Sequence, residues 1–140
     1  MHILQSSEFA NASHVASYIS YGTEPRTDDL NKELINRGVR VIVPRLLPDK
    51  DLDWVDLESD EEFSDVGKVT VVIIPSLGVD RNGYRLGQGG GSYDRALPRF
   101  RAWKITLIHQ GELVESLPHD EWDARVDAVA DSQTILKLNS

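Results

Sequence analysis

The sequence predicts an α/β fold, a three-layer structure with a mostly parallel sheet and helices on both faces. Two observations indicate this fold. Short runs of β-branched and apolar residues show no polar alternation, which is typical of strands buried on both faces. Segments with helix-start and helix-stop residues separate several of these runs, as in repeated β-α-β units. With 140 residues, 40% of them hydrophobic, the chain can bury one sizeable core. We therefore expect one domain over residues 1–140.

The first expected elements are a short strand and a capped helix. Val15–Ser20 is the strand candidate. A helix is expected over Asp28–Arg37, because Thr27 can cap it and acidic residues occupy its first turn. Gly38 follows at the position where a glycine commonly ends a helix.

The remaining elements follow from apolar runs and from proline. A helix is expected from about Ser92, with Pro98 limiting its length. The other strands are expected at Val39–Val43 (closed by Pro44), Val69–Ile74, Trp103–Ile108, Val126–Val129 and, as a possible last strand, Thr134–Leu138.

One acidic segment differs from the rest of the chain. Residues 49–65 contain nine acidic residues and a single lysine, Lys50. The spacing of Asp49, Asp51 and Asp53 is similar to the start of a calcium loop, but Trp54 occupies the place of the required glycine. The expected structure is therefore a solvated, mobile connection.

Residues 85–95, Arg-Leu-Gly-Gln-Gly-Gly-Gly-Ser-Tyr-Asp-Arg, are the most informative part of the chain. Glycines can adopt positive φ and let the backbone approach a ligand closely. A buried strand precedes this loop and a helix is expected after it, which is a common setting for phosphate binding by backbone N–H groups. A glycine-rich surface turn is the alternative interpretation.

The loop does not match the commoner nucleotide or hydrolase motifs. It lacks the Gly-x-Gly-x-x-Gly spacing and the later acidic residue of a dinucleotide fold. It has no Gly-Lys-Ser/Thr, so the lysine of a P-loop is missing. Asp94 stands two residues after Ser92, where a nucleophile elbow requires glycine.

Together with two other stretches, the loop resembles the 5-formyltetrahydrofolate cyclo-ligase family. Residues 72–86 are similar to the family's strand ending in proline and its apolar-Asp-x-x-Gly turn, which lead into the glycine loop. Residues 18–25, Tyr-Ile-Ser-Tyr-Gly-Thr-Glu-Pro, resemble its first strand and folate-contacting turn. Residues 122–129 resemble its C-terminal Asp-x-x-Val-Asp strand. The three stretches occur in the expected order over nearly the whole chain.

This resemblance implies an activity and a set of site residues. The activity is conversion of 5-formyltetrahydrofolate to 5,10-methenyltetrahydrofolate, with ATP and Mg²⁺ as cofactors and release of ADP and phosphate. The implied catalytic residues are Tyr93 and Arg95. The implied ATP-binding residues are Arg85, Gly87, Gln88, Gly89, Gly90, Gly91, Ser92, Tyr93 and Asp94. Ile19, Glu24 and Tyr93 are implied to bind folate, and Asp94 and Asp123 to bind the metal ion.

Two departures from the family pattern leave a second hypothesis open. Family members carry a further basic N-terminal helix, whose cations reach the ATP phosphates, and a longer insert between the Trp54 and Val69 strands. The alternative is therefore a truncated, non-catalytic homologue that binds folate, nucleotide or a protein partner.

Composition limits the partners and the compartment. A net charge of −8 argues against nucleic-acid binding, and no apolar run is long enough to span a membrane. The absence of cysteine fits a reducing cytoplasm. The four histidines have no metal-ligand spacing and are expected at the surface or as satisfied polar residues.

Small-molecule substrates are expected, with the monomeric or homo-oligomeric state open. The arginines near the glycine loop can supply a basic cleft for anionic substrates; they are Arg81, Arg85, Arg95, Arg99 and Arg101.

Overall fold

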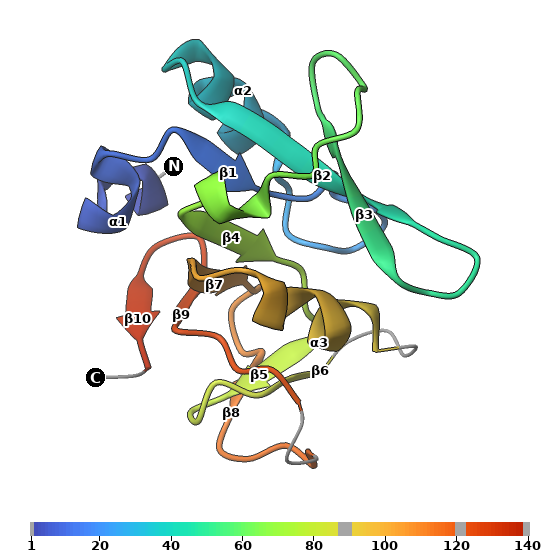
Figure 1. Cartoon of the computed structure of the whole chain (residues 1–140). Coiled ribbons are helices and arrows are strands. Elements are labelled where there is room, and N and C mark those ends of the chain that lie inside the picture. The colour runs from blue at the N-terminus through green and yellow to red at the C-terminus, as the bar shows by residue number, and fades with distance from the viewer. Residues whose placement is uncertain (1, 87–90, 120–122, 139–140) are drawn as a thin grey trace.

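The computed structural model describes residues 2–86, 91–119 and 123–138. Its largest element is a seven-stranded sheet with the order β10-β9-β7-β4-β1-β2-β3 (Figure 1). Strands β9 to β2 in this order run parallel, and the edge strands β10 and β3 run antiparallel to their neighbours. The α/β fold with a mostly parallel sheet is therefore confirmed. The strands are β1 (His14–Ala16), β2 (Arg40–Leu46), β3 (Leu52–Asp56), β4 (Val71–Ile74), β7 (Trp103–Leu107), β9 (Ala128–Ala130) and β10 (Ile135–Lys137).

Helical segments cover both faces of the sheet, as predicted. The central strand β4 shows why, because Val71 and Ile73 belong to one hydrophobic core whereas Val72 and Ile74 belong to the other. All four are fully buried, as expected for a strand whose successive side chains point to opposite faces. One face carries η1 (His2–Gln5), α1 (Ser7–Ala10) and α2 (Asp28–Asn36); the other carries η2 (Val66–Lys68), α3 (Ser92–Ala96) and η3 (Leu97–Arg99). Within the described ranges, no helix has the length and apolar character needed to cross a bilayer.

A second, three-stranded sheet was not predicted. Its order is β6 (Arg85–Leu86), β5 (Gly78–Asp80), β8 (Leu113–Val114), and it lies close to α3 beyond the end of β4 (Figure 1). The strands contain only two or three residues each, too few for an alternation pattern to be recognised in the sequence. This sheet connects the end of β4 to the glycine loop.

A buried carboxylate organises the turn between β5 and β6. Asp80 is fully buried, and its side chain accepts hydrogen bonds from the backbone N–H groups of Asn82 (2.9 Å), Tyr84 (3.1 Å) and Leu117 (2.9 Å). Gly83 has φ +92°, and its carbonyl accepts a 2.8 Å hydrogen bond from the N–H of Val126. The Asp-x-x-Gly turn therefore has a structural role, since it ties the approach to the glycine loop to residues 123–126.

The predicted first strand is too long, and the predicted side-chain cap is wrong. Strand pairing of β1 ends at Ala16; the N–H of Ser17 still donates to the carbonyl of Ile42 on β2 at 2.8 Å, and from Tyr18 onwards the backbone bonds to side chains at the start of α2. The carbonyl of Tyr18 accepts hydrogen bonds from the Thr27 hydroxyl (2.6 Å) and the Asn31 amide (3.1 Å). Thr27 does occupy the N-cap position, but its side chain caps no helix N–H, because it is buried and donates to Tyr18. Gly38 follows the helix with φ +84°, as expected.

Pro44 does not close β2, which continues to Leu46. The pairing partner β1 ends opposite Ile42, so beyond that residue β2 has β3 as its neighbour. Pro44 lies opposite Trp54 in this antiparallel pair. A proline is tolerated there because no second strand requires its missing N–H.

The acidic segment is not a simple mobile connection, because it contains the edge strand β3. Leu52, Trp54 and Val55 are at most 7% exposed. Acidic residues within and beside the strand pair with arginines; the pairs are Asp51 with Arg99, Asp53 with Arg45 and Asp56 with Arg40. The segment therefore contains an edge strand whose apolar residues enter both cores, Leu52 and Trp54 on one face of the sheet and Val55 on the other.

Candidate functional site

Most of the described residues predicted to form the site line one cavity. It has a volume of about 460 Å³ and lies beyond the carboxyl ends of β1 and β4, where parallel sheets commonly bind ligands. The predicted residues in its wall are Glu24, Arg85, Gly91, Ser92, Tyr93, Asp94 and Asp123. Leu46, Leu52, Pro75, Ser76, Leu86 and Pro118 complete the lining.

Arg85 supplies the positive charge of this cavity. Its Nη1 donates to the carbonyl of Pro75 at 3.2 Å, and its guanidinium carbon lies 5.0 Å from the ring centroid of Tyr93. Burial lowers the pKa of Arg85, but an arginine still remains charged at neutral pH. Its Nε is buried and has no hydrogen-bond acceptor among the described residues. Because an unsatisfied buried donor is costly, this N–H is suited to an oxygen of a bound anion.

Asp94 and Asp123 come together from distant parts of the chain. The Oδ1 of Asp94 accepts a 3.2 Å hydrogen bond from the backbone N–H of Ala124, the residue after Asp123. Both carboxylates line the cavity, and both act on Arg85 in the direction that raises its pKa. No cluster of three or more metal-ligating side chains occurs in residues 2–86, 91–119 and 123–138. Two carboxylates nevertheless fit Mg²⁺, which commonly binds to one or two of them together with water and substrate phosphates.

Glu24 lies in a turn that several hydrogen bonds hold in place. Its Oε1 accepts from the backbone N–H of Tyr21 at 2.8 Å. The hydroxyl of Tyr18 donates to the carbonyl of Pro25 at 2.9 Å. From the loop after β7, the Nε2 of His109 lies 2.6 Å from the carbonyl oxygen of Thr23, and this nitrogen must carry the proton if it donates to a carbonyl.

Tyr93 is a half-buried phenol in the wall of the cavity. Burial is the main cause that raises its pKa, and the nearby Glu24 carboxylate acts in the same direction, whereas Arg85 opposes them. The hydroxyl group therefore stays protonated at neutral pH. It can donate a hydrogen bond or pack against a ring, but it is a poor proton acceptor.

Some predicted residues lie away from the cavity or outside the described residues. Ile19 is 62% exposed and is absent from the cavity wall. Arg95 also lies outside the wall, and its Nη2 is 3.5 Å from the carbonyl oxygen of Asp49. The expected basic cluster is wrong in detail, because Arg81 pairs with Glu115, Arg99 pairs with Asp51, and Arg85 alone of the five lines the cavity. Four of the predicted ATP-binding residues fall outside the described residues; they are Gly87, Gln88, Gly89 and Gly90.

Several wall residues could not be found from sequence. Ser76 is buried, and its hydroxyl lies 3.0 Å from the hydroxyl of Thr106 on β7. Its position after a buried strand is only a weak signal of a binding-site residue, because an ordinary proline–serine turn produces the same pattern. Leu46 and Leu52 enter the wall because β2 and β3 form a hairpin, which was not predicted.

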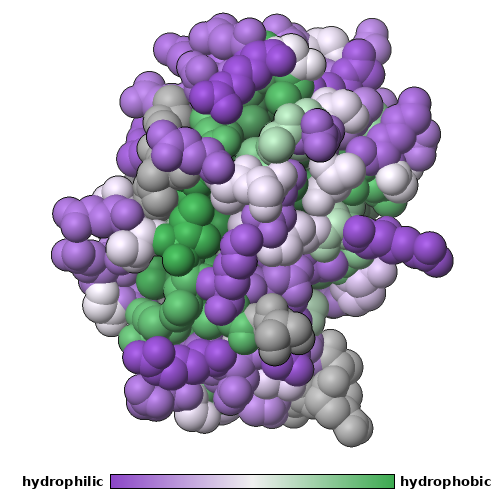
Figure 2. Space-filling model, turned by 90° about the vertical axis from the view of Figure 1, so that its left-hand side faces the viewer, coloured by the Kyte–Doolittle hydropathy of each residue, from purple (hydrophilic) through white to green (hydrophobic). Residues whose placement is uncertain are grey.

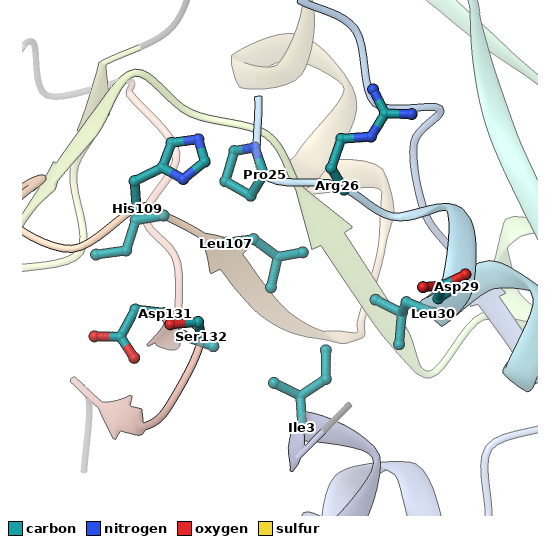
Figure 3. A pocket seen from close by; sticks show the side chains of 11 residues that line it. Ile3, Pro25, Arg26, Asp29, Leu30, Leu107, His109, Asp131 and Ser132 are labelled. Carbon is teal, nitrogen blue, oxygen red and sulfur yellow. The ribbon is translucent and has the colours of Figure 1, made fainter. Parts of the chain in front are cut away.

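A second cavity of about 320 Å³ lies beside Pro25 and His109 (Figure 3). Pro25 and His109 line it, together with Arg26, Asp29 and Asp131 around an apolar base. Figure 2 views the side of the molecule on which α1 and β10 lie and shows apolar surface bordered by polar side chains. Glu24 and Pro25 are neighbours in the turn that His109 contacts, but they line different cavities.

Comparison with known proteins connects this geometry to one family. Residues 1–131 match the model of the 5-formyltetrahydrofolate cyclo-ligase family. The chain is 33% identical over 137 residues to the 5-formyltetrahydrofolate cyclo-ligase of Escherichia coli (strain K12), covering 82% of this chain and 75% of that protein. It is 24% identical over 156 residues to the enzyme of the same name from Mus musculus, covering 91% and 77%.

Solved structures share the fold. The 5,10-methenyltetrahydrofolate synthetase of Mycoplasma pneumoniae superposes with a TM-score of 0.78 at 24% identity, covering 91% of this chain and 77% of that one. The corresponding protein of Aquifex aeolicus gives a TM-score of 0.80 at 24% identity, covering 99% and 79%.

Proposed function

Because this chain belongs to the 5-formyltetrahydrofolate cyclo-ligase family, we propose that the cavity beside Arg85 and Asp94 is its active site. The enzyme converts 5-formyltetrahydrofolate to 5,10-methenyltetrahydrofolate at the expense of ATP. The observation that carries the assignment of the site is the convergence of Glu24, Tyr93 and Asp123 from three distant stretches on one cavity. We propose that residues 1–140 form one domain, which is supported by two hydrophobic cores packed on the same sheet.

The chemistry explains why ATP is required. The formyl oxygen of an amide is a poor leaving group, so ATP first transfers its γ-phosphoryl group to that oxygen and ADP is formed. The N10 nitrogen then attacks the activated carbon, the C–O bond breaks, and phosphate leaves with the oxygen as N10 loses its proton. Phosphoryl transfer depends mainly on positioning and charge neutralisation.

The ATP end of the site is proposed to involve Arg85 and the residues that follow it. The buried Nε–H of Arg85, which has no acceptor among the described residues, is suited to a phosphate oxygen or to the formyl oxygen as it accepts charge. Gly91 has φ +67°, which supports the predicted backbone freedom at the end of the loop. The roles of Gly87, Gln88, Gly89 and Gly90 in phosphate binding remain proposals from the resemblance, as does charge neutralisation by Arg95.

Asp94 and Asp123 are proposed to hold Mg²⁺ through their carboxylate oxygens. When bound, the ion neutralises charge on the ATP phosphates. The Asp94–Ala124 hydrogen bond keeps the two acidic side chains in one region, and Arg85 offsets part of their negative charge.

The folate end is proposed to lie near Glu24 and the apolar wall. Glu24 is positioned to accept hydrogen bonds from pterin N–H groups, while Leu52 and Tyr93 provide surfaces for the ring. Tyr93 acts by packing and by hydrogen-bond donation, because its raised pKa makes it unsuited to remove a proton. Ile19, which is exposed, remains a proposed ring contact that requires the substrate to extend beyond the cavity wall.

The function is tested by turnover of the purified chain. With ATP, Mg²⁺ and 5-formyltetrahydrofolate, we expect the absorbance of the conjugated methenyl product to rise and ADP to accumulate in equal amount. Omission of ATP is the control. ATP binding without product at high enzyme concentration would contradict the proposed activity.

We expect Glu24→Gln to raise KM for 5-formyltetrahydrofolate roughly tenfold or more. The amide can keep the bond to the N–H of Tyr21, but it loses the charge that strengthens hydrogen bonds to pterin N–H groups. KM for ATP should change little. Steady-state kinetics with each substrate varied in turn checks this, and an equal rise of both KM values would argue against a folate-specific role.

His109 is expected to support folate binding indirectly. His109→Ala removes the bond to Thr23, so KM for folate should rise several-fold, consistent with the loss of about 1 kcal/mol of hydrogen bonding. His109→Gln can still donate from its side-chain amide and should recover part of the loss. The check is the folate KM of the wild type and of both variants. If all three values are the same, this hydrogen bond does not position the turn.

A further inference from the structure

The tip of the β2–β3 hairpin rests on the start of α3. The hydroxyl of Ser92 donates to the carbonyl of Lys50 at 2.5 Å, and the Nη2 of Arg95 lies 3.5 Å from the carbonyl oxygen of Asp49. One turn further along, the Nη2 of Arg99 donates to the Oδ2 of Asp51 at 2.8 Å. Three contacts therefore join residues 49–51 to the segment that directly follows the glycine loop.

These contacts set the separation between two walls of the proposed active site. Leu46 and Leu52, which flank the hairpin tip, line the cavity. Gly91 and Ser92, at the start of α3, line the same cavity. A shift of the tip relative to α3 therefore changes the width of the cavity where the glycine loop joins the helix.

The hairpin tip has a backbone that needs support. Lys50 has φ +67°, in the left-handed region that residues with a side chain adopt reluctantly. The hydrogen bond from Ser92 ends on the carbonyl of this same residue. The unusual conformation therefore lies at the point where the hairpin meets α3.

We propose that Asp51, Arg99 and the Ser92–Lys50 hydrogen bond form a hairpin clamp that positions the start of α3, where Gly91, Ser92 and Asp94 line the cavity, for ATP. The inference rests on the proposed function and adds Asp51 and Arg99 to it as positioning residues. Neither lines the cavity, so they act through the α3 segment and the hairpin rather than by touching substrate.

The charges of the pair support this role. Arg99 and the backbone N–H of Leu52 hold the pKa of Asp51 below its usual range, so Asp51 is ionised at neutral pH. The pair is solvent-exposed, and exposed ion pairs contribute little to overall stability. We therefore expect the ion pair to act mainly on the geometry of the site, because small displacements there change the rate strongly.

The chain contains a matched control in the same hairpin. Arg45 and Asp53 form an ion pair across β2 and β3 with a comparable exposure. Both residues belong to the hairpin, so this pair joins β2 to β3 and does not bridge to α3. Comparing variants of the two pairs distinguishes stabilisation of the hairpin itself from positioning of the start of α3.

The test measures KM for ATP, KM for folate and amide hydrogen exchange in Asp51→Asn and Asp53→Asn. We expect Asp51→Asn to raise KM for ATP roughly tenfold, with folate KM within about twofold of wild type. Exchange should accelerate in the peptide containing residues 91–99. Asp53→Asn should leave KM for ATP, KM for folate and amide exchange unchanged. The double variant Asp51→Arg with Arg99→Asp should recover part of the ATP affinity.

The outcomes distinguish failure of the clamp from failure of the proposed function. A wild-type chain without turnover overturns the function, while hydrogen exchange still reports on the clamp. An active wild type with equal ATP KM and equal exchange in the two asparagine variants overturns the clamp. Equal loss of thermal stability and of ATP affinity in both variants would also overturn it, because that result describes a general weakening of the hairpin.

Discussion

Replacing Asp94 by asparagine is expected to lower kcat/KM about 100-fold and to raise the Mg²⁺ concentration needed for half-maximal rate. The asparagine oxygen can still accept the hydrogen bond from Ala124, so the local backbone should keep its arrangement. What the substitution removes is the negative charge of the carboxylate, which binds Mg²⁺ more strongly than a neutral amide oxygen does. Because loss of groups that merely support metal ligands typically costs roughly 10- to 100-fold, loss of a direct ligand should reach at least that range.

Steady-state rates over a series of Mg²⁺ concentrations measure this effect. Asp65→Asn is a suitable control, because Asp65 pairs with Lys68 at 3.7 Å and is not part of the cavity wall. Excess Mg²⁺ should restore part of the activity of Asp94→Asn. A variant with reduced rate but unchanged Mg²⁺ dependence would show that Asp94 does not bind the ion, and Asp123→Asn then becomes the next comparison.

Gly83→Ala is expected to destabilise the fold by roughly 2–5 kcal/mol, a large part of the stability of a chain this size. Two effects add. At φ +92° an L-residue is strained, which costs about 1–2 kcal/mol. A Cβ at this position would also lie 2.5 Å from the backbone carbonyl oxygen of Val126, so the turn must move away from its partner.

Gly111→Ala separates these two effects. Gly111 has a similar φ of +87°, but a Cβ there meets no atom within 4 Å. We therefore expect it to cost only the conformational part, about 1–2 kcal/mol. Urea unfolding of both variants gives the comparison. Equal losses would show that the close approach to Val126 relaxes without cost, and the turn would then be more adaptable than its hydrogen bonds suggest.

The parts predicted well are those with a local signal. Continuous apolar runs such as Val69–Ile74 predict strands buried on both faces, and β4 lies within that range. Pro98 limits α3 to a few residues before a 3-10 turn, because a proline cannot continue the backbone hydrogen bonding. The three family-like stretches predict residues of one site, since Glu24, Tyr93 and Asp123 line the same cavity.

The parts predicted poorly depend on contacts between distant residues. High charge over residues 49–65 suggests a solvated connection, but arginines from β2 and η3 pair with its acids while its apolar residues enter the core. His109 carries no motif, and its bond to Thr23 exists because the ends of β1 and β7 lie at the same edge of the sheet. Thr27 satisfies a local capping pattern, yet its hydroxyl bonds to Tyr18.

The amino-acid sequence by itself therefore determined the fold class, the main buried strands, the family and a set of residues that line one cavity. These follow from backbone preferences and from short motifs, which act over a few neighbouring residues. Only the tertiary structure decided which charges face the cavity, which signature residues such as Asp80 have a structural role, and how the hairpin meets α3. The physical reason is that burial and pairing depend on residues far apart in the chain, such as His109 and Thr23, which are 86 positions apart, and local sequence does not report them.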